Sequence, residues 1–345
     1  MSIYIVTNRS ISEPYINDVN ERAMPTFRVA KCEIDEENKK VKYGLVPDNY
    51  AAGYQEIASA AKSKDDAHLN GTAKMFFDLY NQMVKSKEPC DTLFFIHGFN
   101  YTFKSTLEHI YELHELYIKP KNSPIEHLIY VSWPTVGNLF LTYWNDQEDA
   151  EETGRVLSRL FSKLFGFFID AFEKAELERC KHKIHLAAHS MGNQVLKHML
   201  AGIPDSKLFP LFKEVLLLNA DVEYDVFEPG QPFTKLGDIS ERVHMYIHNS
   251  DDALRISRTT KNFKKRLGFN GPKNRDILDA STFIMDTTYG EKPKNKKEKW
   301  IDHWGYLNRP DVVKDIKYVL TGMDEDDIPV REKWDESSLY FYFPK

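Results

Sequence analysis

Short, almost wholly apolar segments that alternate with helical patterns are the feature that most limits how this chain can fold. From residue 92 onward these segments are "TLFFIHG" (92–98), "HLIYVSW" (127–133), "KIHLAAH" (183–189), "EVLLLNA" (214–220), "RVHMYIH" (242–248) and "STFIMDT" (281–287). Strands that are buried on both faces of a parallel sheet have this composition. The pattern therefore predicts an α/β protein with a mostly parallel central sheet.

Helical patterns fill the intervals between these segments. An apolar stripe at helical spacing runs through 101–118, and a long pattern with an acidic start covers 146–180. Residues 310–322 open with proline and close with glycine, as helices often do. Regular alternation of strand and helix implies right-handed crossovers, so we expect helices to flank the sheet.

The first 90 residues have a different character. The β-branched and aromatic runs at 3–7, 27–34 and 40–46 predict antiparallel N-terminal strands, and a surface helix is expected near 72–86.

No linker rich in proline, glycine and serine divides the 345 residues. We therefore expect one domain over 1–345. Within it, 1–90 supply the N-terminal strands and helix, 91–322 the core that carries the site, and 323–345 a C-terminal extension.

Charge and cysteine content exclude several classes of protein. The net charge of -6 gives no general attraction to nucleic acid. Cys32, Cys90 and Cys180 are far apart and form no CxxC pair, which argues against a disulfide framework and for a reducing, cytoplasmic location. The start of the chain lacks a signal-peptide pattern, and the apolar-rich stretch 157–172 is too short and too charged to span a bilayer.

The pentapeptide Ala188-His-Ser-Met-Gly192 marks the first candidate site. It follows a predicted buried strand and precedes a helical pattern, which is the setting of the nucleophile elbow in serine hydrolases. Ser190 would be the nucleophile, and the Met191 N–H at the helix start could stabilise an oxyanion. The alternative is that Ser190 is only a helix N-cap.

A second signal lies at the end of an earlier strand, in "LFFIHGFN" (93–100). In α/β-hydrolases the loop at this place supplies another oxyanion-hole N–H, here that of Phe99. Gly98 would let the backbone turn toward the cavity. An ordinary turn at the end of a strand is the alternative.

A serine nucleophile needs a histidine base and an acid that orients it. In hydrolases of this kind the chain order is Ser, then Asp or Glu, then His. Asp251 follows a predicted strand and His303 lies in a later loop, so we predict Asp251 as the acid and His303 as the base. Asp252 and Asp221 remain alternative acids; Asp251 could also be only a helix N-cap, and His303 only a surface loop residue.

Seven motifs in succession resemble an uncharacterised family of α/β-hydrolases, the domain of unknown function numbered nine hundred. They are "LFFIHGFNYTF", "YVSWPTVGN", "TYWNDQEDA", "LAAHSMGNQVL", "LNADVEYDVF", "NSDDALRIS" and "DHWGYL". The resemblance covers residues 3–320 and implies an α/β-hydrolase fold. It supports Ser190, Asp251 and His303 as a catalytic triad, and it places the amides of Phe99 and Met191 at the oxyanion hole. The family brings no substrate with it.

Three further groups of residues allow other interpretations. A zinc site at His182, His185 and His189 is disfavoured because no carboxylates accompany them, so no metal or organic cofactor is expected. Aromatic residues in 133–144 would form either core or a lid over a pocket. Basic residues in two predicted loops would either face solvent or attract an anionic substrate or a membrane surface; they are Arg258, Lys261, Lys264, Lys265, Arg266, Lys273, Arg275, Lys292, Lys294, Lys296, Lys297 and Lys299.

Taken together, these features predict a serine hydrolase that cleaves a small-molecule or lipid ester in the manner of carboxylesterases and lipases. Amidases, peptidases and thioesterases use the same chemistry, so they remain alternatives. A non-catalytic binding protein on a hydrolase fold is a further alternative, because fold alone does not fix function.

Overall fold

Eleven strands form the central sheet of the computed structural model, which describes residues 1–18, 22–48, 59, 69–135, 143–173, 180–260, 264–294, 302–335 and 339–344. All six apolar segments become strands of this sheet: β6 (Asp91–Ile96), β7 (Ile125–Ser132), β8 (Ile184–His189), β9 (Phe212–Leu218), β10 (Ser240–Ile247) and β11 (Thr282–Asp286). Nearly all of their residues are buried, as strands covered on both faces require. Each pairs in parallel with its neighbours, so the predicted mostly parallel sheet is confirmed.

Strands from the two ends of the chain extend the sheet on both sides. β1 (Ser2–Thr7) is fully buried and parallel to β7, whereas β4 (Arg28–Asp35) and β5 (Lys40–Leu45) continue from it in antiparallel pairing. On the other side, β13 (Tyr340–Tyr342) is parallel to β11, and β12 (Glu332–Lys333) pairs antiparallel with β13. The spatial order is β12-β13-β11-β10-β9-β8-β6-β7-β1-β4-β5.

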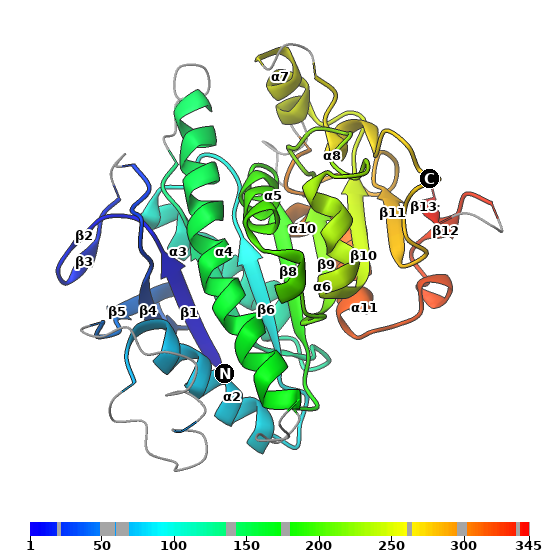
Figure 1. The fold of residues 1–345 in the computed structure, drawn as a ribbon. Helices are drawn as coiled ribbons and strands as arrows, with labels where there is room; N and C mark the ends of the chain where they lie inside the picture. Colours follow the sequence, from blue (N-terminus) through cyan, green and yellow to red (C-terminus); the bar gives the residue numbers. More distant parts are fainter. Residues whose placement is uncertain are drawn as a thin grey trace.

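Helices cover both faces of the sheet and create two separate cores (Figure 1). One face packs against α2 (Gly71–Lys85), α4 (Tyr143–Glu173), α5 (Gly192–Gly202) and α6 (Leu236–Ile239). The other face packs against α3 (Phe103–Leu113) and α11 (Pro310–Leu320). Within the described residues, no helix has both the length and the apolar character needed to cross a membrane.

The remaining elements are short. They are the hairpin β2 (Ile11–Ser12) and β3 (Tyr15–Ile16), the helices α7 (Asp252–Thr260), α8 (Leu267–Asn270) and α10 (Gly305–Asn308), and the single turns η1 (His114–Ile118), η2 (Asp205–Lys207), η3 (Pro232–Lys235) and η4 (Glu325–Asp327). Because the main strands are parallel, their carboxyl ends meet at one edge of the sheet. That edge is at the top of Figure 1, where α7 and α8 lie.

Two predicted helices differ in detail from the structure. The pattern at 101–118 becomes α3 followed by the π-helical turn η1, because a wider turn changes the spacing after Leu113. The pattern at 146–180 corresponds to α4, which begins at Tyr143; residues 174–179 lie outside the described part of the chain.

Candidate active site

Ser190 occupies the sharp turn between β8 and α5, as the pentapeptide predicts. Its φ is 51°, in the left-handed region that residues with a side chain rarely adopt. The Ser190 N–H donates to the carbonyl of Leu218 on the neighbouring strand (2.9 Å), and the Ser190 carbonyl accepts from the N–H of Asp221 (3.0 Å). The strained conformation is thus held by backbone bonds to the β9 end of the sheet.

Two glycines allow the elbow to interlock with the loop after β6. A Cβ on Gly98 would lie 2.8 Å from Ser190 Cβ and 3.0 Å from the His189 carbonyl oxygen. A Cβ on Gly192 would lie 2.6 Å from the carbonyl oxygens of both Ile96 and His97. Since real Cβ contacts are longer, a side chain at either position would push the two loops apart.

The two residues after the pentapeptide brace the elbow through their side chains. Asn193 Nδ2 donates to the carbonyls of Ala188 (2.8 Å) and Ser190 (3.1 Å), and Gln194 Nε2 donates to the carbonyl of Asp221 (2.8 Å). Sequence reasoning did not assign these roles. The signal available was two amide residues at the start of a buried helix, where an apolar face would be expected.

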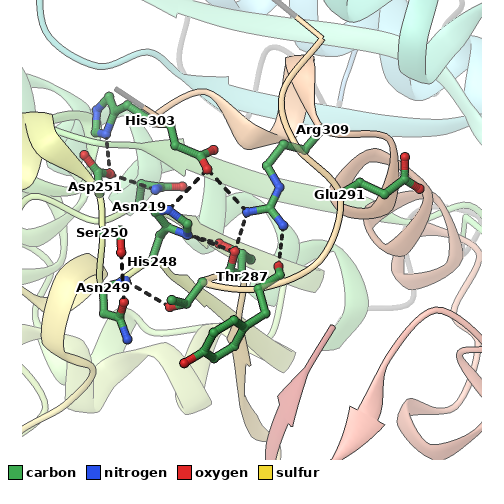
Figure 2. Close-up of polar contacts among 12 residues, drawn as sticks. Asn219, His248, Asn249, Ser250, Asp251, Thr287, Glu291, His303 and Arg309 are labelled. Atoms are coloured by element: carbon green, nitrogen blue, oxygen red, sulfur yellow. Dashed lines mark hydrogen bonds and ion pairs between the residues drawn. The ribbon is translucent and has the colours of Figure 1, made fainter. Parts of the chain in front are cut away.

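His303 and Asp251 form a short, buried pair at the same edge of the sheet (Figure 2). His303 Nδ1 lies 2.6 Å from Asp251 Oδ2, and the two side chains are 5% and 0% exposed. Asn219 Nδ2 donates to the same carboxylate oxygen (2.8 Å), and the N–H of Leu254 donates to Oδ1 (3.0 Å). Both carboxylate oxygens of Asp251 are therefore held by hydrogen bonds.

The three candidate acids occupy different surroundings. Asp251 binds His303 and also caps α7, so its predicted and alternative roles coexist. Asp252 is partly exposed and lies 3.0 Å from Arg255 on the surface. Asp221 accepts from Ser257 Oγ (2.7 Å) and lies 3.4 Å from Arg266 Nε. The geometry therefore favours Asp251 among the three.

His189 connects the elbow to the histidine loop. Its ring centroid lies 4.7 Å from that of His303, and its Nε2–H donates to the His303 carbonyl (3.1 Å). Burial, and then the nearby His303, hold the pKa of His189 well below its usual value. His189 is thus a neutral spacer between the serine and the loop that carries His303.

The loop that carries Phe99 is held from beneath. Thr135 Oγ1 accepts from the Tyr101 N–H (2.8 Å) and donates to its carbonyl (2.9 Å), and Arg9 donates to that carbonyl as well (2.6 Å). Arg9 is 3% exposed, and burial lowers its pKa to about 10, which leaves it charged at neutral pH. This clamp fixes the backbone two residues after Phe99.

The motif histidine of that loop, His97, is structural. Its Nδ1–H donates to the Gly98 carbonyl (2.7 Å), and its Nε2 accepts from the Trp133 N–H (3.1 Å). Burial and the charge of Arg9 hold the pKa of His97 well below its usual value, so the ring is neutral. Trp133 is completely buried and stacks on this ring with an interplanar angle of 8°, so it belongs to the core.

Residues 78–321 match the family model described as alpha/beta hydrolase of unknown function. The chain belongs to this family. The match covers more than half of the chain and confirms the fold expected from the seven motifs. No curated protein matches the chain. In α/β folds the sites lie at the carboxyl ends of the parallel strands, and Ser190 and Asp251 follow such ends here, those of β8 and β10.

The residues weighed for a metal site do not converge. His182 and His185 lie 3.8 Å and 3.3 Å from Asp91, at the end of β8 opposite to His189. In the described residues, one group brings three ligand atoms within 4.8 Å of one another: Glu36, His114 and Glu115. The ammonium of Lys119 lies 2.9 Å from Glu36 and 2.8 Å from Glu115, so a cation already occupies that position.

The expectation of exposed basic loops is wrong for one residue. Arg266 is completely buried and lies 3.4 Å from Asp221 and 3.6 Å from Glu223, so it joins the α8 region to the end of β9. Lys264, Lys265, Lys273, Arg275, Lys292 and Lys294 are exposed as expected. The predictions for Lys261, Lys296, Lys297 and Lys299, for the side chain of Arg258, and for Phe140 with the side chains of Tyr143 and Trp144 fall outside the described residues.

Proposed function

We propose that the protein is a serine hydrolase that cleaves a carboxylic ester through an acyl-enzyme. The observation that carries the proposal is the 2.6 Å contact between His303 Nδ1 and Asp251 Oδ2, at the sheet edge that also bears Ser190 with its φ of 51°. A histidine oriented by a buried carboxylate is the base that a serine hydroxyl needs at neutral pH.

The reaction would proceed in two halves. Ser190 Oγ attacks the ester carbonyl while His303 Nε2 takes the hydroxyl proton, and the amides of Met191 and Phe99 bind the oxyanion. The carbon–oxygen bond to the alcohol then breaks, and His303 returns the proton to the departing oxygen. Water repeats the attack on the acyl-serine, which releases the acid and restores Ser190. Asp251 stays charged and holds the imidazole throughout.

Covalent labelling tests this proposal directly. A fluorophosphonate probe should label the wild-type protein, and Ser190→Ala should abolish labelling while leaving the unfolding transition in place. Hydrolysis of short p-nitrophenyl esters should fall by at least ~10³-fold in the same variant. Equal labelling of both proteins would contradict the proposal.

The identity of the acyl substrate requires a separate comparison. A panel of esters, thioesters, amides and phospholipids, ranked by kcat/KM, would separate an esterase from an amidase, peptidase or thioesterase on the same residues. Turnover of none of them above the Ser190→Ala background would favour a binding protein on a hydrolase fold.

A further inference from the structure

Asp302, the residue immediately before His303, contacts two buried side chains, His248 and Arg309. Figure 2 labels both of these partners. Its φ is 47°, in the left-handed region. His248 Nε2 lies 3.2 Å from Asp302 Oδ2, and an Arg309 guanidinium nitrogen lies 3.7 Å from the same oxygen. His248 and Arg309 are 3% and 2% exposed, so neither can relocate easily.

Both ring nitrogens of His248 face oxygen atoms. Its Nδ1 lies 2.8 Å from the Thr287 carbonyl oxygen, and its Nε2 lies 3.2 Å from Asp302 Oδ2. The buried ring therefore links Asp302 to the loop after β11.

Arg309 is also held by partners other than Asp302. It pairs with Asp311 (2.9 Å), and it donates to the carbonyls of Thr287 and Tyr289 (2.5 Å for Tyr289). These contacts join the loop after β11 to the start of α11. Asp302 therefore contacts a residue that already links these two segments.

Two loops meet here at two points. His248 and Asp251 belong to one loop after β10, and the N–H of Asp251 donates to the His248 carbonyl (3.2 Å). His248 binds Asp302 and Asp251 binds His303, so successive residues of the second loop are each held by the first. One contact fixes the imidazole, and the other fixes the backbone from which it projects.

We propose that Asp302 is a positioning residue, which sets the direction of His303 through its contacts with His248 and Arg309. This rests on the proposed role of His303 as the base. The left-handed conformation is unfavourable for a residue with a side chain. Aspartate tolerates it better than most residues, and the contacts with His248 and Arg309 stabilise it.

A series of substitutions at Asp302 separates charge from backbone conformation. Asp302→Asn keeps a residue that tolerates positive φ but removes the charge, and Asp302→Gly keeps the conformational freedom but removes the side chain. Asp205→Asn is the matched control, because Asp205 is 84% exposed and pairs with Lys235 on the surface. All are made in the full chain, and the free energy of unfolding is measured for each.

The kinetic readout is the division of the effect between kcat and KM on a p-nitrophenyl ester. A misdirected base should lower kcat by ~10-fold in Asp302→Asn and by up to ~10²-fold in Asp302→Gly, with KM within about two-fold of wild type. Adding His248→Gln to Asp302→Asn should lower kcat little further than Asp302→Asn alone. The reason is that both substitutions act on the same contact, between His248 Nε2 and Asp302 Oδ2. Unchanged kcat in both Asp302 variants would overturn the proposal.

A second readout does not depend on turnover. The short His303 Nδ1–H bond to Asp251 should give a downfield proton NMR signal, which Asp251→Asn removes and thereby assigns. We expect the signal to broaden or shift in both Asp302 variants and to persist in Asp205→Asn. A persistent, unshifted signal in both Asp302 variants would overturn the positioning role, even if the protein hydrolyses no ester.

If the wild-type protein hydrolyses the ester and kcat is unchanged in both Asp302 variants, the proposed function stands and only the positioning role is removed. If Asp302→Gly fails to fold, Asp302→Asn decides.

Discussion

Two buried histidine–carboxylate pairs each include a residue of β10 or of the loop after it, and the two pairs have different surroundings. His303 and Asp251 meet at the carboxyl edge of the sheet, 2.6 Å apart. His244, within β10, lies 2.9 Å from Glu214 on β9, and both side chains are almost completely buried. The two pairs have similar lengths, so their surroundings are what distinguishes them.

The second pair is one part of a larger charged network. Glu214 also binds Arg242 (2.6 Å), and Arg242 reaches Glu325 of the C-terminal segment (2.7 Å). Arg331 lies 3.0 Å from Glu325 and 3.1 Å from Asp315 of α11. Each charge faces at least one of opposite sign, so this network joins the C-terminal segment to the sheet. The Asp251 pair instead lies at the carboxyl edge of the sheet, which also bears Ser190.

The largest effect on kcat is expected at Asp251, the proposed acid, and a much smaller one at the adjacent Asp252. Asp251→Asn should lower kcat by ~10³- to ~10⁴-fold, because an amide stabilises the wrong tautomer of His303 and cannot balance its charge. Asp252→Asn should cost far less, since Asp252 pairs with Arg255 on the surface. Ester hydrolysis by both variants, with unfolding curves as the control, measures the difference. Equal losses would mean that the assignment of the acid is wrong.

The next largest effect is expected for a substitution at Glu214, and it should lower the free energy of unfolding while leaving kcat unchanged. Glu214→Gln removes the carboxylate that His244 and Arg242 share, and breaking a buried ion pair costs about 3–5 kcal/mol. Urea unfolding should show this loss, while kcat of the folded protein stays at the wild-type value. A fall in kcat without a loss of stability would contradict the division between the two regions.

Glu223, in the loop after β9, predicts a dependence of stability on pH. Burial alone would raise the pKa of Glu223, but Lys197 at 2.9 Å, with help from Arg266, lowers it to about 2. Because the folded-state pKa is below the unfolded value, the stabilisation is present above pH ~4.5 and is lost as the pH falls toward ~2. The contribution is about 2–3 kcal/mol after allowance for partial solvent exposure. We therefore expect the free energy of unfolding in urea to fall less steeply between pH 6 and pH 3 in Glu223→Gln than in wild type. Equal pH dependence in both proteins would contradict the lowered pKa of Glu223.

The smallest effect concerns the residue that supports the acid. Asn219 has a φ of 44°, so Asn219→Gly keeps the backbone and removes only the bond to Asp251. Loss of a hydrogen bond to a charged group costs about 1.5–3 kcal/mol, part of which should appear as a ~10-fold fall in kcat. Steady-state kinetics test this, and an unchanged kcat would show that His303 alone is enough to hold Asp251.

Sequence reasoning reached the edge of the sheet at which Ser190 and the Asp251–His303 contact lie. Apolar runs mark where each strand stops, and parallel strands bring those ends together. The catalytic roles of these three residues stay a prediction. It did not reach Asn219 or Asp302, because their contacts depend on positive φ values that no hydrophobic pattern encodes. It misjudged Arg266, because a lysine- and arginine-rich stretch does not reveal that Asp221 and Glu223 bury one of its members. It also missed β13, whose three residues are too few to show a periodicity.

The place of β1 has a practical consequence for anyone who shortens this chain. β1 lies outside residues 78–321, yet it sits between β7 and β4 with all six of its residues buried. A fragment cut to that range would leave the hydrogen-bonding edge of β7 bare and would remove Arg9 from beneath Tyr101. Bare edges recruit other strands, so such a fragment should aggregate instead of yielding a smaller folded protein.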